Sequence, residues 1–259
     1  MALQQKALTS INLLALILLV YWNYLSNTGI LTGKTMVELS AKYDSLFTPA
    51  GYAFSIWGLI YTWLLVSAVY LCVALIRNKE LSLSLSAVRC IPWLVVAYFF
   101  TGAWLYFWLN EQIFISVVVM IFILMTLGWC VIRNLEVIQE TSGIEKWLFW
   151  QPVIIYFGWI NVATIANVAA YLNSIDFSLG LEQQTWTILL IVIAAGLGFL
   201  MLRFKNTSAY ALVLVWAFVA IGVRHYNIFT ELSLVAYLNA GLVFCLVLVQ
   251  VLKQFKAVK

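Results

Sequence analysis

Charged residues are scarce in this 259-residue chain: they make up 9% of the sequence, whereas soluble globular domains carry about 25%. Histidine occurs once, and the four cysteines show no CxxC spacing, so no metal-ligand pattern is present. Hydrophobic residues make up 65% and recur from end to end, which excludes a water-soluble enzyme. The net charge of +4 is modest, and we expect no nucleic-acid partner.

Eight apolar runs without Asp, Glu, Lys, Arg or His predict transmembrane helices. A helix needs about 20 apolar residues to cross a hydrocarbon layer about 30 Å thick. The runs are 8–25, 50–76, 90–109, 113–132, 148–172, 186–202, 209–223 and 232–252, of which the seventh is the shortest. The sequence therefore predicts an all-α polytopic integral membrane helix bundle with about eight transmembrane helices.

The distribution of positive charge predicts the orientation, because Lys and Arg are retained on the cytoplasmic side. With the N-terminus inside and eight spans, three of the 14 Lys and Arg residues lie outside, namely Lys34, Lys42 and Arg224. The other eleven lie inside: Lys6, Arg77, Lys79, Arg89, Arg133, Lys146, Arg203, Lys205, Lys253, Lys256 and Lys259. We therefore expect a protein of the cell (inner) membrane with both termini in the cytoplasm.

The first loop is the longest, at residues 26–49. Within it Met36, Leu39, Tyr43 and Leu46 recur at helical spacing, which predicts a short amphipathic helix on the outer membrane surface. Such a segment is either a lid over a site in the bundle or an interfacial connector, and the sequence leaves both interpretations open.

The four cysteines and the single histidine do not predict a catalytic or metal site. The cysteines Cys72, Cys90, Cys130 and Cys245 are interpreted as small buried hydrophobic residues. His225 follows Arg224 in a predicted outer loop, and we expect it to be solvated. Conventional catalytic constellations are missing, so we expect neither a hydrolase nor a transferase, no metal site and no required cofactor.

Aromatic side chains form stripes on three of the predicted spans. Phe54, Trp57 and Tyr61 follow the spacing i, i+3, i+7 and share an arc of about 60°. Trp104 and Trp108 continue the same spacing from Thr101.

A third face, on the fifth span, carries Tyr156, Trp159, Thr164 and Asn167. Its polar groups must point into the bundle, because an unpaired amide in hydrocarbon costs several kcal/mol. One interpretation of these faces is helix packing, with Gly158, Ala163 and Ala166 allowing close approach and with Asn161 and Asn167 bonding across helices. The other is a cavity that binds a flat apolar ligand.

These segments resemble signature motifs of the TspO/MBR family, the tryptophan-rich sensory and translocator proteins. The stretch from Pro49 to Tyr61 is similar to the second-helix motif, Ala103 to Trp108 resembles the third-helix motif, and Tyr156 to Asn167 resembles the fifth-helix motif. The resemblance covers about residues 8–172. It implies a five-helix membrane unit in residues 1–172, whereas residues 173–259 form three additional transmembrane helices of unknown role.

The resemblance also implies a pocket beneath the first loop for porphyrins or other hydrophobic ligands. We expect the ligand-binding residues to be Phe54, Trp57, Tyr61, Trp104, Trp108, Tyr156, Trp159, Thr164 and Asn167. Lys34 or Lys42 is expected to meet the propionates of a tetrapyrrole. The sequence departs from the family at three places. Thr101 stands where the family has Asn, and residues 116–120 lack the acid usual in the fourth helix. The proline that usually comes just before the fifth-helix tyrosine is shifted to Pro152. These departures leave the identity of the ligand open.

Two function classes follow. The first is a membrane receptor or sensor that binds a planar hydrophobic ligand, such as a tetrapyrrole or a similar lipid-like molecule, from the bilayer; light-dependent porphyrin breakdown is implied by the resemblance alone. The second is a facilitator, or an accessory subunit of a membrane complex. For this second class, the small residues Ala194, Ala195, Gly196 and Gly198 would form a docking face for a partner protein or for a second copy in a homo-oligomer.

Overall fold

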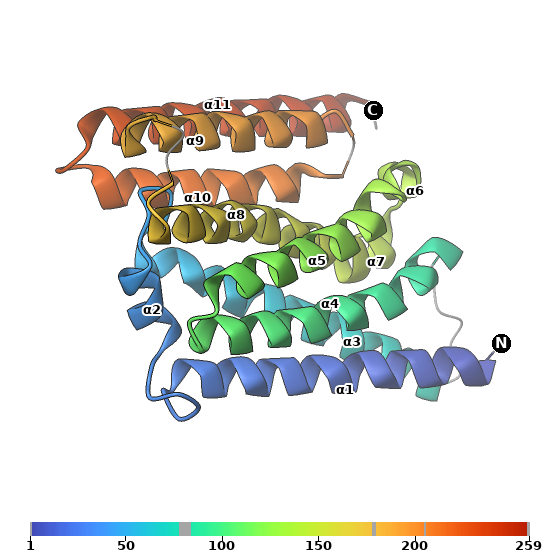
Figure 1. The fold of residues 1–259 in the computed structure, drawn as a ribbon. Helices are drawn as coiled ribbons and strands as arrows, with labels where there is room; N and C mark the ends of the chain where they lie inside the picture. Colours follow the sequence, from blue (N-terminus) through green and yellow to red (C-terminus); the bar gives the residue numbers. More distant parts are fainter. Residues whose placement is uncertain (1, 78–83, 178–179, 205, 258–259) are drawn as a thin grey trace.

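A computed structural model describes residues 2–77, 84–177, 180–204 and 206–257, and Figure 1 shows their arrangement. Within these residues, eight helical stretches are long and apolar enough to cross a membrane. They lie on α1 (Ala2–Asn27), η1 with α3 (Gly51–Ser55 and Ile56–Ile76), α4 (Leu85–Leu109), α5 (Ile113–Ile132), α7 with η2 and α8 (Gly143–Glu145, Lys146–Trp150 and Gln151–Ser174), α9 (Gln183–Met201), α10 (Ser208–His225) and α11 (Thr230–Ala257). The short helices α2 (Met36–Lys42) and α6 (Leu135–Glu140) lie in the loops. The all-α helix-bundle prediction is confirmed.

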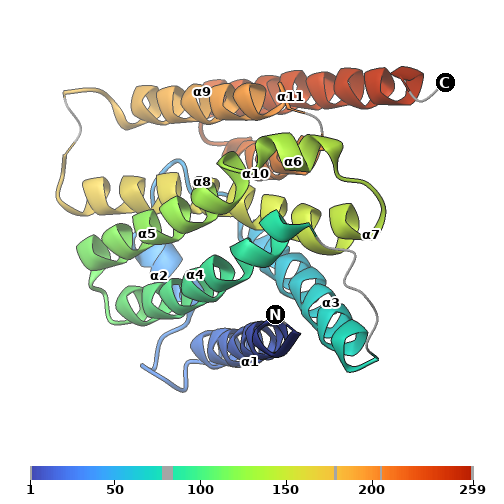
Figure 2. The same ribbon diagram turned by 90° about the vertical axis from the view of Figure 1, so that its right-hand side faces the viewer.

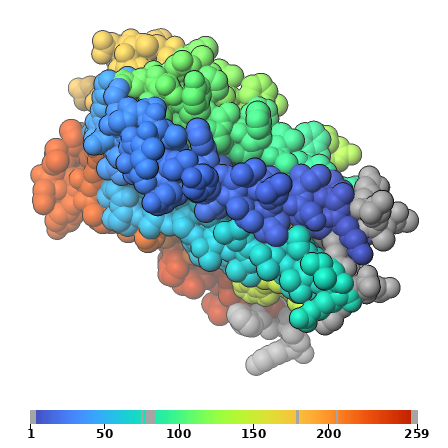
Figure 3. All heavy atoms as spheres, turned by 90° about the horizontal axis from the view of Figure 1, so that it is seen from below, coloured from blue at the N-terminus to red at the C-terminus, as the bar shows by residue number. Residues whose placement is uncertain are grey.

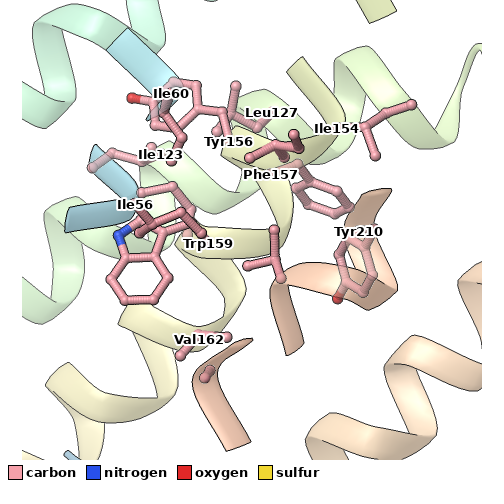
Figure 4. Close-up of a cluster of buried hydrophobic side chains, with 14 of the residues drawn as sticks. Ile56, Ile60, Ile123, Leu127, Ile154, Tyr156, Phe157, Trp159, Val162 and Tyr210 are labelled. Carbon is pink, nitrogen blue, oxygen red and sulfur yellow. The ribbon is translucent and has the colours of Figure 1, made fainter. Parts of the chain in front are cut away.

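Helix α8 lies at the centre of the bundle. Every residue from Gln151 to Val162 on it is buried, and helices pack against it on several sides. In Figure 4, Trp159 and Tyr156 point toward Ile56 and Ile60 of α3, whereas Phe157 faces Tyr210 of α10. α8 therefore joins the first part of the chain to the last three helices in one core.

Small residues set the close approaches between helices. A Cβ atom at Gly158 would lie 3.3 Å from the Tyr210 backbone, so α8 and α10 pack closely at this glycine. A Cβ at Gly198 would lie 2.6 Å from Leu214, and Ala194 and Ala195 of the same helix are also buried. Three of the four small residues of the expected docking face are therefore covered within the chain, and Gly196 alone of the four borders open space.

The seventh apolar run forms a helix of full length. α10 extends the predicted 209–223 to Ser208–His225, and its last turn holds Arg224 and His225. His225 is only 4% exposed, and its Nε2 atom lies 2.9 Å from the Leu46 carbonyl oxygen. The expectation of a solvated loop histidine is wrong, because the first loop folds back over this end of α10 and covers the ring.

The cysteines differ from one another in burial. Cys90 and Cys130 are buried as expected, Cys72 is half-buried, and Cys245 is exposed on α11. The prediction that all four are buried is therefore wrong for Cys72 and Cys245. On α11 the Cys245 side chain lies among exposed Leu242, Phe244 and Leu248, as on a face that contacts lipid.

Both ends of the described chain lie on the same side of the bundle, as Figure 1 shows, which is what an even number of spans requires. Figure 2, turned by 90°, shows α9, α10 and α11 as a layer on one side of α8, with α1, α3 and α4 on the other. Lys79, Lys205 and Lys259 of the predicted cytoplasmic set lie outside the described residues.

Candidate ligand cavity beneath the first loop

A cavity of about 140 Å³ lies between the first loop and the helices α1, α3, α4 and α8. Six of the nine predicted ligand-binding residues line it: Phe54, Trp57, Trp104, Trp108, Trp159 and Asn167. Three helices that are far apart in sequence thus bring their aromatic stripes to one hollow. The rings enclose a space and do not merely fill it.

The aromatic wall is continuous. Trp57 contacts two wall residues, with ring centroids 6.5 Å from Trp104 and 6.4 Å from Trp159. Trp104 stacks in turn on Trp108 at 6.3 Å, and Phe54 meets Trp159 edge-on at 6.1 Å. Such pairs each contribute about 0.5–1.5 kcal/mol beyond their burial, so the wall holds its shape without a ligand.

The other three predicted residues lie behind this wall. Tyr61 stacks on Trp57 at a centroid distance of 5.2 Å, and Tyr156 hydrogen-bonds to Thr101. Thr164 donates to the Ile160 carbonyl oxygen of its own helix at 2.6 Å. None of the three lines the cavity. Tyr61 and Tyr156 both contact the Trp57 ring and so support the wall.

Asn167 is held by a hydrogen-bond network that joins three helices. Its Oδ1 accepts from the Trp104 indole nitrogen at 2.7 Å, and its Nδ2 donates to the Ser116 hydroxyl at 3.0 Å. Asn161, in contrast, donates to the Phe157 carbonyl oxygen of its own helix at 2.9 Å. The expected bonding across helices is confirmed for Asn167, whereas for Asn161 it is wrong.

Two indole groups at the cavity have no hydrogen-bond partner. The Nε1 atoms of Trp108 and Trp159 are buried, and no acceptor for them exists among the described residues. An unpaired buried donor costs about 1–3 kcal/mol. A ligand with acceptor atoms would recover part of this cost.

The first loop covers the cavity through α2. Thr35 and Glu38 form a capping box at its start, with the Thr35 amide donating to Glu38 Oε2 at 2.7 Å. Met36, Val37 and Ser40 line the cavity, while Leu39 is buried. The predicted amphipathic helix is confirmed, and its position favours the lid interpretation over the connector.

A single carboxylate fastens this lid. Glu111, in the turn between α4 and α5, accepts hydrogen bonds from Lys34, Lys42 and the Tyr43 hydroxyl. These three donors lower the pKa of Glu111 to about 2, chiefly through Lys34 and then Lys42. The hydrogen bond to Glu111 in turn raises the pKa of Lys42. Lys34 and Lys42 are therefore paired in this closed arrangement and do not face the cavity.

The later part of the loop is anchored on the C-terminal helices. Arg224 forms an ion pair with Asp44 and donates to the Thr48 carbonyl oxygen at 3.0 Å. The Ala50 amide donates to the Ala220 carbonyl oxygen at 3.1 Å. In Figure 3 the first loop and the adjoining end of α1, both blue, lie between α3 and the green α4 and α5. The loop thus closes the end of the bundle.

Sequence reasoning missed several lining residues. Asn23 and Asn27 come from the last turns of α1, and Ala163, Ala166 and Ala170 form a small-residue floor on α8. The alanines recur at i, i+3 and i+7 in line with Trp159 and Val162, a signal that was present in the sequence. No such pattern marks the two asparagines, because only packing places α1 beside the cavity.

Comparisons with known proteins agree with this architecture. The family model described as TSPO-like protein matches residues 9–249. The match runs through the five-helix unit and through most of the three helices that follow it. Neither the search of curated proteins nor that of solved structures found a match.

Proposed function

The chain belongs to the TSPO-like protein family and is an integral membrane protein, and on this premise we propose that it is a membrane receptor or sensor for a planar hydrophobic ligand. The ligand binds beneath α2, between the tryptophan rings of α3, α4 and α8. A tetrapyrrole, or a lipid-like molecule of similar flatness, has the chemistry that this wall favours: an extended π surface with polar atoms at its edge.

The observation that carries this proposal is the pair of unpartnered indole donors. Trp108 and Trp159 both line the cavity, and their Nε1 atoms have no acceptor among the described residues. If the wall served only helix packing, the unpaired indole N–H groups would lower stability without any benefit. Each nitrogen exposes less than 1 Å² in the closed arrangement, so a ligand with acceptor atoms at its edge reaches these donors as the lid and the rings move to admit it.

The size of the cavity requires the lid to move. At about 140 Å³ it resembles the 150 Å³ of a cavity that holds one benzene, whereas sites for larger ligands measure about 300–1,000 Å³. A macrocycle therefore needs α2 to swing outward. That movement breaks the contacts of Glu111 and frees Lys34 and Lys42, whose ammonium groups then stand at the mouth, ready to meet ligand carboxylates.

A porphyrin titration tests the site. Protoporphyrin IX is added to purified protein in detergent, and binding is followed by the absorbance of the porphyrin. Trp108→Phe and Trp159→Phe keep an aromatic ring but remove the donor, so each should weaken binding by about two- to tenfold, the value of one hydrogen bond.

The matched control is Trp129→Phe. Trp129 lies on α5 and is 49% exposed, outside the cavity. The Trp129→Phe variant should bind protoporphyrin IX as tightly as the unaltered protein does. Equal affinity in all three variants would rule out the site beneath α2.

A further inference from the structure

A second and larger hollow lies toward the other end of α8. Its volume is about 880 Å³, and α3, η2, α8, α10 and α11 wall it. We call it the α3–α10 groove and define it by Leu59, Trp63, Lys146, Leu212, Val251 and Gln254. Neither the aromatic stripes nor the first loop contributes to it.

The groove exists because α3 and α10 meet at one end only. Near the first loop, α10 is joined to the turn that leads into α3 by the Ala50–Ala220 backbone hydrogen bond and by Trp216, whose Nε1 donates to the Ala53 carbonyl oxygen of η1 at 3.1 Å. From there α3 runs away from α10, as Figures 1 and 2 both show. At the wide end Trp63 donates to the Trp147 carbonyl oxygen at 2.7 Å, and the two rings stack at 6.4 Å.

The groove is apolar along its length and polar at its wide end. Leu59 and Leu212 along it are 51% and 43% exposed. The wide end lies on the side of the chain termini and is lined by Lys146, Trp147, Gln151 and Gln254. This is the order of parts in a phospholipid, an acyl chain followed by a polar headgroup.

The charge at the wide end is positive. Lys146 has no ion-pair partner among the described residues, and none of the residues that line the groove is acidic. The neighbouring Glu145 is turned elsewhere: its carboxylate accepts from the Ser84 backbone amide and hydroxyl and from the Trp150 indole. The carboxylate therefore does not neutralise the ammonium group of Lys146.

A polar donor that lines the same groove also lacks a partner among the described residues. The Nε2 atom of Gln254 is buried and has no acceptor among the described residues. Gln254 also lines an adjoining hollow that contains Arg203 and Lys253, so positive side chains lie on both sides of it. An anionic group with several acceptor oxygens fits this end.

We propose that the α3–α10 groove binds one anionic phospholipid. An acyl chain lies along Leu59, Leu212 and Val251, and the phosphate meets Lys146 and accepts from Gln254 once its buried amide turns into the groove. The stacked Trp63 and Trp147 rings lie where the acyl chain gives way to the headgroup, the level that tryptophan prefers in membranes. Because acyl chains are common to all phospholipids, the cation and the unpartnered donor are what select the anionic headgroup. This proposal does not depend on the proposed function of the cavity beneath α2.

Native mass spectrometry of the delipidated full-length protein tests the proposal. Dioleoyl phosphatidylglycerol and dioleoyl phosphatidylcholine, which share their acyl chains, are titrated separately. One phosphatidylglycerol should bind more tightly than phosphatidylcholine. Lys146→Gln should weaken phosphatidylglycerol binding by about fivefold and leave phosphatidylcholine unchanged. Arg133→Gln removes a charge of the predicted cytoplasmic set that lies over Trp129, outside the groove, and should have no effect.

A second pair of variants tests the acyl-chain part. Leu212→Trp fills the groove and should reduce the binding of both lipids, whereas Leu238→Trp, at a position on α11 that is 62% exposed and outside the groove, should not. Equal binding of the two lipids by the unaltered protein would overturn the proposal. So would an unchanged preference for phosphatidylglycerol in Lys146→Gln, or competition by inorganic phosphate at millimolar concentration.

Discussion

At the scale of single residues, Asn161 and Asn167, two of the buried amides of α8, have different hydrogen-bond partners. Asn167 joins α8 to Trp104 of α4 and to Ser116 of α5, whereas Asn161 bonds to its own helix. Removing Asn167 leaves the Trp104 indole donor without its acceptor, whereas the Ser116 hydroxyl still donates to the Ile113 carbonyl oxygen at 2.7 Å. Removing Asn161 takes one donor from the Phe157 carbonyl oxygen, which lies within the same helix.

Asn167→Leu should therefore destabilise the protein more than Asn161→Leu. We expect a loss of about 1–3 kcal/mol for Asn167→Leu, because the buried Trp104 indole is left without an acceptor, and less than about 1 kcal/mol for Asn161→Leu. Thermal unfolding in detergent, followed by tryptophan fluorescence, measures both. Equal unfolding temperatures for the two variants would contradict this account of the network.

At the scale of elements, the early part of the lid is held by Glu111 of the α4–α5 turn and the later part by α10. Lys34, Lys42 and Tyr43 converge on Glu111, while Arg224 and His225 of α10 hold the segment that follows. Leu39 and Phe47 are buried beneath it. The early part, including α2, is therefore the part that can open.

Glu111→Gln should speed ligand entry. The amide cannot hold two ammonium groups, so α2 opens more often, and the association rate of protoporphyrin IX should rise several-fold in stopped-flow absorbance. Glu38→Gln is the matched control: it also removes one negative charge, here from the lid itself, but Gln can replace Glu in the capping box. An equal rise in both variants would mean that net charge, and not the contacts of Glu111, sets the rate.

The contacts of Glu111 also predict the pH dependence of ligand entry. The pKa of Glu111 is lowered from its ordinary value of 4.5 to about 2, so the ionised form that closes the lid is present above pH 4.5 and is lost as the pH falls through about 2. The pKa of Lys42 is raised from 10.5, so its charge persists up to and beyond pH 10.5. The association rate should be constant between about pH 5 and 9. A midpoint near pH 6 would show that another group controls the lid.

At the scale of the whole molecule, α10 supports the site from outside the cavity. α10 packs against α8 at Gly158 and anchors the first loop through Arg224, although it adds no residue to the cavity. The family match through residue 249 agrees with this arrangement. The boundary at residue 172 stays a prediction, since the helices on its two sides share one hydrophobic core.

The orientation predicted from positive charge can be tested on the intact protein. Cytoplasmic termini place the lid outside, so a cysteine introduced by Ile30→Cys, at a position that is 72% exposed, should react with a membrane-impermeant maleimide added to whole cells. A fluorescent protein fused after Lys259 should fold and fluoresce in the cytoplasm. Labelling at residue 30 only after the cells are lysed would reverse the orientation.

The sequence by itself determined the membrane class, the eight spans and the aromatic stripes. These properties depend on composition and on the helical period of 3.6 residues, and both are local. It also indicated the short lid helix, because amphipathic spacing is local as well. The sequence did not predict the burial of His225, because the ring is covered by the first loop, whose Leu46 is 179 residues away in sequence.

Only the tertiary structure decided which stripe residues border a hollow. Trp57 and Tyr61 share one stripe, yet Trp57 lines the cavity, whereas Tyr61 lies one turn further along α3 and stacks on the Trp57 ring from behind. The contacts of Glu111 and the α3–α10 groove likewise depend on side chains from separate helices meeting in space. Helical spacing fixes the direction of a side chain on its own helix, but the neighbour that it meets is set by how the helices pack.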